Sequence, residues 1–79
     1  MTWNNRVVDM SKENLDDPWF EICEVFYNSK LEPMGHTGGI AVVGESVEEL
    51  KITLNRMLKC LEDPVLKPED FTGELDDEI

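Results

Sequence analysis

The chain has 79 residues, of which eighteen are acidic and seven are basic, giving a formal net charge of −11. A chain of this length forms one small domain with a narrow stability margin. The negative charge excludes simple attraction to DNA, RNA or an anionic membrane, because such binding depends on clusters of lysine and arginine. The sequence shows neither an apolar run of roughly 18 residues nor a signal-peptide pattern. We therefore expect a folded cytoplasmic protein with reduced thiols.

Two segments in the first third of the chain have the composition of β-strands. Residues 3–10 place Val7 and Val8 among polar side chains, and residues 16–18 then favour a turn. Residues 19–27 are dense in aromatic and β-branched side chains, and both faces of this segment are apolar. The second segment is therefore predicted to be a central strand, with a helix on one face and another part of the chain on the other.

The next residues predict a return to the sheet. Residues 28–33 are typical of a turn, and residues 34–37 are a candidate third strand. Two glycines at 38–39 permit a kink before residues 40–43, which are again typical of a strand. The predicted fold class is α+β: a small antiparallel sheet of three to four strands, in β-β-β-α order, packed on one C-terminal helix.

A helix is predicted from Ser46 to about Glu62. Ser46 is followed three residues later by Glu49, which is the capping-box arrangement, and Pro64 prevents the helix from continuing. The apolar residues recur at three- and four-residue spacing and form one stripe about 100° wide. The members of this stripe are Val47, Leu50, Leu54, Met57, Leu58 and Leu61. We expect the stripe to be the face that packs against the sheet.

The C-terminal residues 69–79 carry six acidic residues and no basic residue: Glu69, Asp70, Glu74, Asp76, Asp77 and Glu78. Clustered like charges repel and bury little surface, which predicts a flexible acidic tail at 69–79 after a domain of residues 1–68. The alternative is a tail that folds onto a basic partner. Val65 and Leu66, between two prolines, predict an extended piece laid against the domain, and Phe71 is a candidate anchor for the start of the tail.

Five short segments together resemble known sequences: residues 3–8 (WNNRVV), 24–27 (EVFY), 44–50 (GESVEEL), 57–58 (ML) and 61–66 (LEDPVL). They look like a group of short uncharacterised proteins from bacteria and their phages. This resemblance spans residues 3–71 and implies no activity. A looser similarity is to the core of HicB-type antitoxins, in which a strand hairpin precedes a helix. That similarity rests on the order of the elements and on Gly44, Glu45, Ser46 and Glu49.

The sequence contains few of the residue patterns that catalysis requires. Its glycines match neither of the common phosphate-binding loops. A dyad of Cys23 and His36 is the sharpest enzymatic alternative, but Cys23 lies in an apolar strand, where thiols are usually inert. A zinc site formed by Cys23, Cys60 and His36 would lack the spacing of a zinc knuckle. We predict no enzyme activity, no catalytic residue, no metal and no cofactor.

Surface residues carry the functional prediction. Ile52 lies opposite the apolar stripe, as either an ordinary exposed residue or the apolar centre of an interface. Trp19 and Tyr27 are candidate partner contacts on the sheet, because exposed aromatic side chains favour a covering partner. The six acidic residues of the tail complete the set of partner-binding candidates.

These features predict a small acidic adaptor or regulatory module that binds a basic protein partner. Direct nucleic-acid binding and membrane binding are not expected. The alternative is a phage-type nucleic-acid mimic that inhibits a host nucleic-acid-binding enzyme or defence system. A homodimer through the sheet face or a sheet edge is a further alternative.

Overall fold

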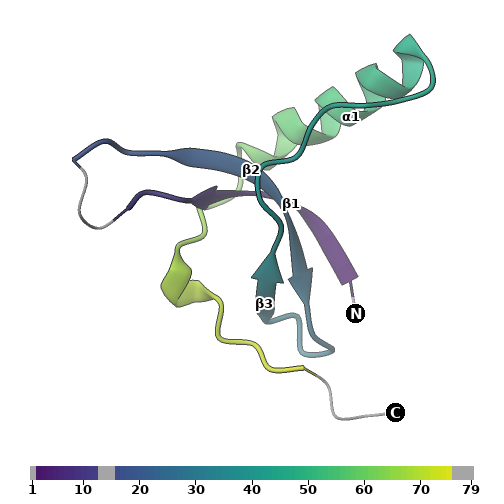
Figure 1. Ribbon diagram of the computed structural model, residues 1–79. Helices are drawn as coiled ribbons and strands as arrows, with labels where there is room; N and C mark the ends of the chain where they lie inside the picture. Colours follow the sequence, from purple (N-terminus) through teal and green to yellow (C-terminus); the bar gives the residue numbers. More distant parts are fainter. Residues whose placement is uncertain (1, 13–15, 76–79) are drawn as a thin grey trace.

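The computed structural model describes residues 2–12 and 16–75, which form a sheet, a long helix and a short 3-10 helix (Figure 1). The elements are β1 (Thr2–Asp9), β2 (Phe20–Tyr27), β3 (Pro33–His36), α1 (Val47–Cys60) and η1 (Pro68–Asp70). The strands pair antiparallel in the order β1-β2-β3. The predicted α+β class, with strands before one helix, is therefore confirmed.

β2 is the central strand, as its two apolar faces predict. On one face of the sheet Val8, Cys23 and Val25 are almost completely buried, with at most 1% of each residue exposed. Leu66 joins them from the C-terminal part of the chain to form the main core cluster. The core therefore depends on residues from both ends of the sequence.

The chain after α1 adds a short extended piece to the free edge of β1. The Leu66 N–H donates to the Val7 carbonyl at 2.9 Å, and the Leu66 carbonyl accepts from the Asp9 N–H at 2.8 Å. Val8 and Leu66 thereby form a parallel bridge. This arrangement confirms the prediction that the proline-flanked pair lies against the domain.

The chain then crosses the same face of the sheet to the edge of β3. Phe71 packs against the core cluster, and its ring centre lies 4.8 Å from that of His36. Beyond it, the Gly73 N–H donates to the Pro33 carbonyl at 2.8 Å. The charge pattern predicts a domain of residues 1–68, whereas the contacts with the sheet continue to Gly73.

The residues after β3 follow β2 for a short distance and then leave the sheet. The Thr37 N–H donates to Glu24 O at 2.9 Å, and the Ile40 N–H donates to Ile22 O at 3.1 Å. Between these two bonds the Glu21 carboxylate accepts the Gly39 N–H at 2.7 Å. Residues 40–43 form no strand, so that prediction is wrong; the chain instead turns toward the start of α1 (Figure 1).

α1 begins at the predicted cap. The Ser46 Oγ accepts the Glu49 N–H at 3.2 Å, as expected for an N-cap residue. The Glu49 carboxylate reaches back to the Glu45 N–H at 2.6 Å, one residue earlier than in a standard capping box. The reciprocal contact therefore fixes the turn before the helix as well as its first turn.

Only the C-terminal half of α1 packs on the sheet, on the face opposite the main core cluster. Met57 and Cys60 are buried there, and the main contacts of the helix with the strands are with β1. The N-terminal half projects beyond the sheet (Figure 1). We call residues 40–62, which comprise α1 and the segment leading into it, the arm.

The prediction that the apolar stripe of α1 packs on the sheet is wrong for most of its length. Leu54 is 53% exposed and Leu58 is 65% exposed. The side of α1 that meets β1 is that of Met57 and Cys60, and the exposed leucines point away from it. In addition, the N-terminal half of the helix projects beyond the sheet (Figure 1). The arm therefore presents apolar side chains to solvent.

Candidate interaction surface

The arm is fixed to the sheet at its C-terminal end. The Arg56 Nε donates to Asn5 Oδ1 at 2.8 Å, and Asn5 is 4% exposed. The Arg56 guanidinium also lies 5.8 Å from the ring centre of Trp3, within the range of a cation–π contact. These contacts join the C-terminal half of α1 to β1.

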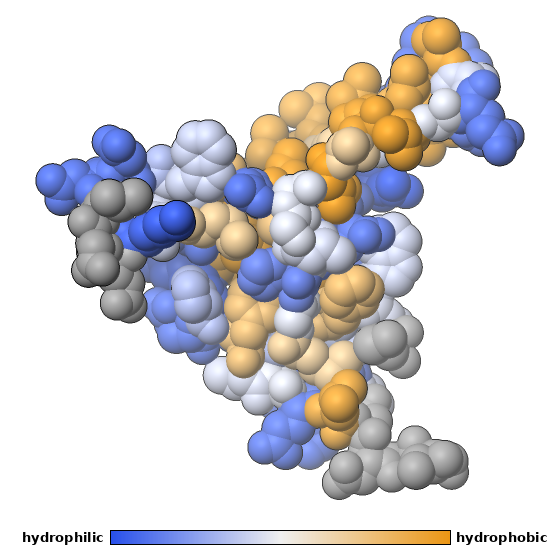
Figure 2. Space-filling view, viewed as in Figure 1, coloured by the Kyte–Doolittle hydropathy of each residue, from blue (hydrophilic) through white to orange (hydrophobic). Residues whose placement is uncertain are grey.

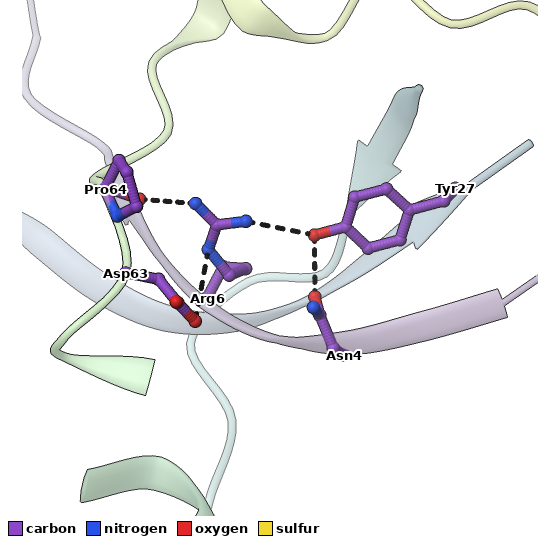
Figure 3. Close-up of polar contacts among 5 residues, drawn as sticks. All are labelled: Asn4, Arg6, Tyr27, Asp63 and Pro64. Atoms are coloured by element: carbon purple, nitrogen blue, oxygen red, sulfur yellow. Dashed lines mark hydrogen bonds and ion pairs between the residues drawn. The ribbon is translucent and has the colours of Figure 1, made fainter. Parts of the chain in front are cut away.

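A second set of polar contacts holds the chain just after α1 (Figure 3). The largely buried Arg6 side chain donates through Nη2 to the Pro64 carbonyl at 2.6 Å, and its Nε lies 4.0 Å from Asp63 Oδ2, which is ion-pair distance. Its Nη1 donates to the Tyr27 hydroxyl at 3.4 Å, and that hydroxyl donates to Asn4 Oδ1 at 2.7 Å. The base of the arm is thus tied to the outer strand β1 and to the central strand β2.

With its base held, the arm presents a narrow apolar surface. At 100° per residue, three side chains of α1 and that of its C-cap residue fall within a sector of about 60°. We call them the α1 stripe: Val47 (67% exposed), Leu54 (53%), Leu58 (65%) and Leu61 (57%). Figure 2 shows hydrophobic residues gathered along the projecting arm. Single exposed apolar residues are ordinary, whereas a contiguous row of them marks an interaction surface.

Charge is distributed unevenly between α1 and the rest of the chain. α1 contains two of the eighteen acidic residues and three of the seven basic residues. The remainder, which we call the acidic body, therefore has sixteen acidic and four basic residues. α1 is thus nearly neutral, whereas the rest of the sequence is strongly negative.

The structure does not gather the apolar partner-binding candidates into one site. Ile52 is 64% exposed but lies on the side of α1 away from the α1 stripe. Trp19 is 61% exposed, and its Nε1 donates to Glu21 at 2.8 Å. Tyr27 ends β2, about 24 Å from the start of that strand, and its hydroxyl takes part in the contacts of Figure 3.

The acidic candidates differ in how available their carboxylates are to a partner. Glu69 is exposed in η1, whereas the neighbouring Asp70 carboxylate accepts the Lys67 N–H at 2.8 Å. Glu74 is exposed, and its backbone carbonyl accepts Asn28 Nδ2 at 3.1 Å. The remaining candidates lie outside the described residues: Asp76, Asp77 and Glu78.

Cys23, Cys60 and His36 all take part in packing: both thiols are buried, and the histidine ring contacts another ring. Burial raises the pKa of the Cys23 thiol, with a further contribution from Glu21, and burial likewise raises the pKa of the Cys60 thiol. The His36 ring packs on Phe71. A raised thiol pKa disfavours the thiolate that a nucleophile or zinc ligand requires. Within residues 2–12 and 16–75, no three His, Cys, Asp or Glu side chains converge as a metal site.

The α1 stripe was identified in the sequence but assigned to the core. Its periodicity shows which residues share a face, and it contains no information about what covers that face. The sequence does contain one indication that this face is exposed. On the helix surface Lys51 lies beside Leu58, at the border of the α1 stripe. A lysine there is poorly suited to a fully buried helix face.

Comparison with protein-family models, with curated proteins and with solved structures found no match to the chain. The resemblances based on the short sequence segments therefore stay predictions. In the part of the chain that the structure describes, no helix combines the length and hydrophobicity needed to cross a membrane.

Proposed function

We propose that the protein is a non-enzymatic binding module whose acidic body engages a basic protein partner. The observation that carries this proposal is the separation of charge: sixteen acidic against four basic residues outside α1. A field of one sign over a surface steers an oppositely charged partner and accelerates the encounter. The protein would act as an adaptor or regulator through this contact.

Several carboxylates of the body are available for such a partner. Asp16, Asp17, Glu69 and Glu74 are all exposed. In contrast, Arg6, one of the four cations of the body, is held in the contacts that fix the base of the arm. Because Arg6 pairs with Asp63 of the same body, this contact withdraws one charge of each sign, and the balance of the remaining charges stays strongly negative.

The test is affinity capture from a cell lysate at low salt, followed by kinetics with the purified partner. We expect a basic protein whose association rate falls as ionic strength rises above about 0.1 M, where the Debye length is about 10 Å. Capture of no basic protein, a salt-independent association rate, or direct DNA binding in a gel-shift assay at physiological salt would each contradict the proposal.

A pair of variants locates the contact. Glu69→Gln combined with Glu74→Gln removes two carboxylates from the body and should lower the association rate about threefold. Glu48→Gln combined with Glu49→Gln removes the same charge from α1, which lies outside the acidic body, and serves as the matched control. An equal effect of both pairs would show that net charge, rather than the body, determines binding.

A further inference from the structure

A hollow of about 400 Å³ lies at the end of the sheet where β1 connects to β2. We call it the Trp19 hollow, and its lining residues are Met10, Lys12, Asp17, Trp19 and Glu21. Met10 packs against the main core cluster, so the hollow lies directly beside the core. Its volume is near the lower end of the range for small-ligand pockets, which suits a single side chain of a partner.

Hydrogen bonds fix the aromatic side of the Trp19 hollow before any ligand binds. The Trp19 N–H donates to Ser11 Oγ at 2.9 Å, and the Trp19 carbonyl accepts the Met10 N–H at 2.8 Å. The indole Nε1 donates to Glu21 Oε2 at 2.8 Å, and the other oxygen of this carboxylate accepts the Gly39 N–H at 2.7 Å. A ring held in this way loses little conformational freedom when a ligand stacks on it.

A similar pair of residues elsewhere in the chain already holds an arginine. On β1, Trp3 and Asn5 stand two residues apart, so their side chains share one face of the sheet. The Arg56 guanidinium lies 5.8 Å from the Trp3 ring centre, and its Nε donates to Asn5 Oδ1 at 2.8 Å. Trp19 and Glu21 have the same spacing where β2 begins. Their acceptor is a carboxylate, which binds a guanidinium more strongly than an amide does.

The chain has no arginine left to occupy this second pair. Its two arginines are Arg6 and Arg56, and both are already engaged, with the chain after α1 and with Asn5 respectively. Within residues 2–12 and 16–75, a cation lies over the ring of Trp3 and none lies over that of Trp19. An arginine that stacks on the second indole must therefore come from another molecule.

The charge of the Trp19 hollow favours a cation, and its geometry favours arginine over lysine. The carboxylates of Asp17 and Glu21 line it together with the single ammonium group of Lys12. Each oxygen of Glu21 accepts one hydrogen bond and has a further lone pair for a ligand. A guanidinium is planar, stacks on an indole and forks onto a carboxylate, whereas the ammonium group of lysine is more strongly hydrated.

We propose that the Trp19 hollow binds an arginine side chain of the basic partner, with the guanidinium stacked on Trp19 and hydrogen-bonded to Glu21. Asp17 adds negative charge at the same place. The existence of a basic partner rests on the proposed function, whereas affinity for arginine is a property of the hollow itself. The two are therefore tested separately.

The first test needs no natural partner. A blocked, otherwise neutral peptide with one central arginine is added to the ¹⁵N-labelled full chain, and the indole N–H signals of Trp3 and Trp19 are followed by NMR. We expect the Trp19 signal to move with a dissociation constant on the order of 1 mM, and the Trp3 signal to stay in place because Arg56 lies against that ring.

Two matched peptides test the chemistry of recognition. Citrulline in place of arginine keeps the shape and removes the charge, and it should bind at least about tenfold more weakly. Lysine keeps the charge and removes the planar fork, and it should also bind more weakly than arginine. Equal binding of the citrulline peptide, equal binding of the lysine peptide, or movement of the Trp3 signal instead of the Trp19 signal would each overturn the proposal.

Variants of the full chain test the residues. Trp19→Leu should weaken the arginine peptide about tenfold, and Glu21→Gln about fivefold, because the glutamine keeps an oxygen acceptor but loses the charge. Glu48→Gln removes the same charge from α1 and is the matched control. An equal effect of Glu21→Gln and Glu48→Gln would overturn the site. NMR spectra of the variants check the fold, and the wild-type titration decides the proposal even if a variant unfolds.

The captured partner separates this inference from the proposed function. Trp19→Leu should raise the dissociation rate of that complex at least about fivefold, because the loss of a stacked contact acts mainly on dissociation. Equal kinetics of wild type and Trp19→Leu would overturn the hollow as the contact and leave the acidic body as the binding surface. Arginine-peptide binding without capture of any basic protein would support the hollow and contradict the proposed function.

Discussion

At the scale of single residues, Gly73 determines how closely the C-terminal segment approaches β3. A Cβ atom added at this position would lie 2.7 Å from the Glu32 carbonyl oxygen and 2.9 Å from the Pro33 carbonyl oxygen. Both oxygens belong to backbone that is held in the sheet or in the turn before it. The close approach therefore requires glycine for steric reasons, with no need for an unusual backbone angle.

Gly73→Ala should destabilise the protein by about 1–3 kcal/mol, because the segment must move away from β3 to accommodate the methyl group. Chemical denaturation measures the change in unfolding free energy. Gly38→Ala is the matched control, since a Cβ atom at Gly38 would meet nothing within 4 Å. Equal stability of the Gly73→Ala variant and the wild type would show that the segment does not lie against β3 as described.

Asp9 makes the stability of the β1–β2 connection depend on pH. The side chain and then the backbone amide of Ser11 stabilise the carboxylate and hold the pKa of Asp9 below its ordinary value of 3.8. The Ser11 N–H donates to Asp9 Oδ1 at 2.9 Å, and the Ser11 Oγ accepts the Trp19 N–H at 2.9 Å. Asp9 thus holds Ser11 in position, and Ser11 in turn links the end of β1 to Trp19 just before β2.

Because the pKa of Asp9 is lower in the folded state, its contribution to stability is present above pH 3.8 and is lost as the pH falls through the folded-state pKa. Asp9→Asn should therefore be less stable than the wild type at neutral pH, and the difference should narrow in strong acid. Denaturation curves at several pH values test this. A difference that grows on acidification would contradict the expected sign.

At the scale of elements, α1 divides into a packed half and a projecting half. Met57 is 7% exposed against the sheet, whereas Leu54, less than one turn earlier, is 53% exposed. The two side chains belong to one apolar pattern but have different surroundings. Substitution of Met57 therefore tests packing on the sheet, whereas substitution of Leu54 changes a side chain that is largely outside this packing.

Met57→Ala should lower the unfolding free energy by about 2–5 kcal/mol, because it leaves a cavity between α1 and β1. Leu54→Ala should cost less than about 1 kcal/mol, because more than half of this residue is exposed. Denaturation of the two variants under identical conditions makes the comparison. A larger cost for Leu54→Ala than for Met57→Ala would place the stripe, rather than the Met57 side, against the sheet.

The elements themselves could be predicted because their signals are local. The aromatic and β-branched run at 19–27 indicates a strand wherever it lies, and the Ser46 cap begins α1 through a contact with Glu49, three residues away. The strand expected at 40–43 depended on pairing with a distant segment. The carboxylate of Glu21 occupies the Gly39 N–H just before it, a contact that strand propensity does not reveal.

The candidate site could be predicted less well than the fold. The sequence identified the residues of the α1 stripe but could not show that the helix leaves the sheet, since that depends on the anchors at Asn5 and Arg6. Tyr27 was expected to meet a partner because aromatic side chains favour burial. Its hydroxyl instead takes part in the contacts of Arg6, a pairing between positions 21 residues apart.

At the scale of the whole molecule, residues 69–75 are part of the folded unit. A chain ending at Pro68 loses the packing of Phe71 on the core and the hydrogen bond from Gly73 to Pro33. We expect its unfolding free energy to fall by about 2 kcal/mol or more. A chain ending at residue 75 keeps these contacts and is the control. If both truncated chains match the full chain in stability, the segment contributes nothing to the fold.

The bridge between Val8 and Leu66 also has a consequence for the time course of folding. It joins a strand near the start of the sequence to a residue after the helix, and the neighbouring Arg6–Pro64 contact links positions 58 residues apart. The β1–β2 hairpin can form early from nearby residues, whereas this closure must bring distant segments together at a larger entropic cost. On a ribosome, the core would stay open until Leu66 has emerged, so its completion is expected late in synthesis. Pulse-labelling of backbone amides during refolding should accordingly show protection of β2 before that of Leu66.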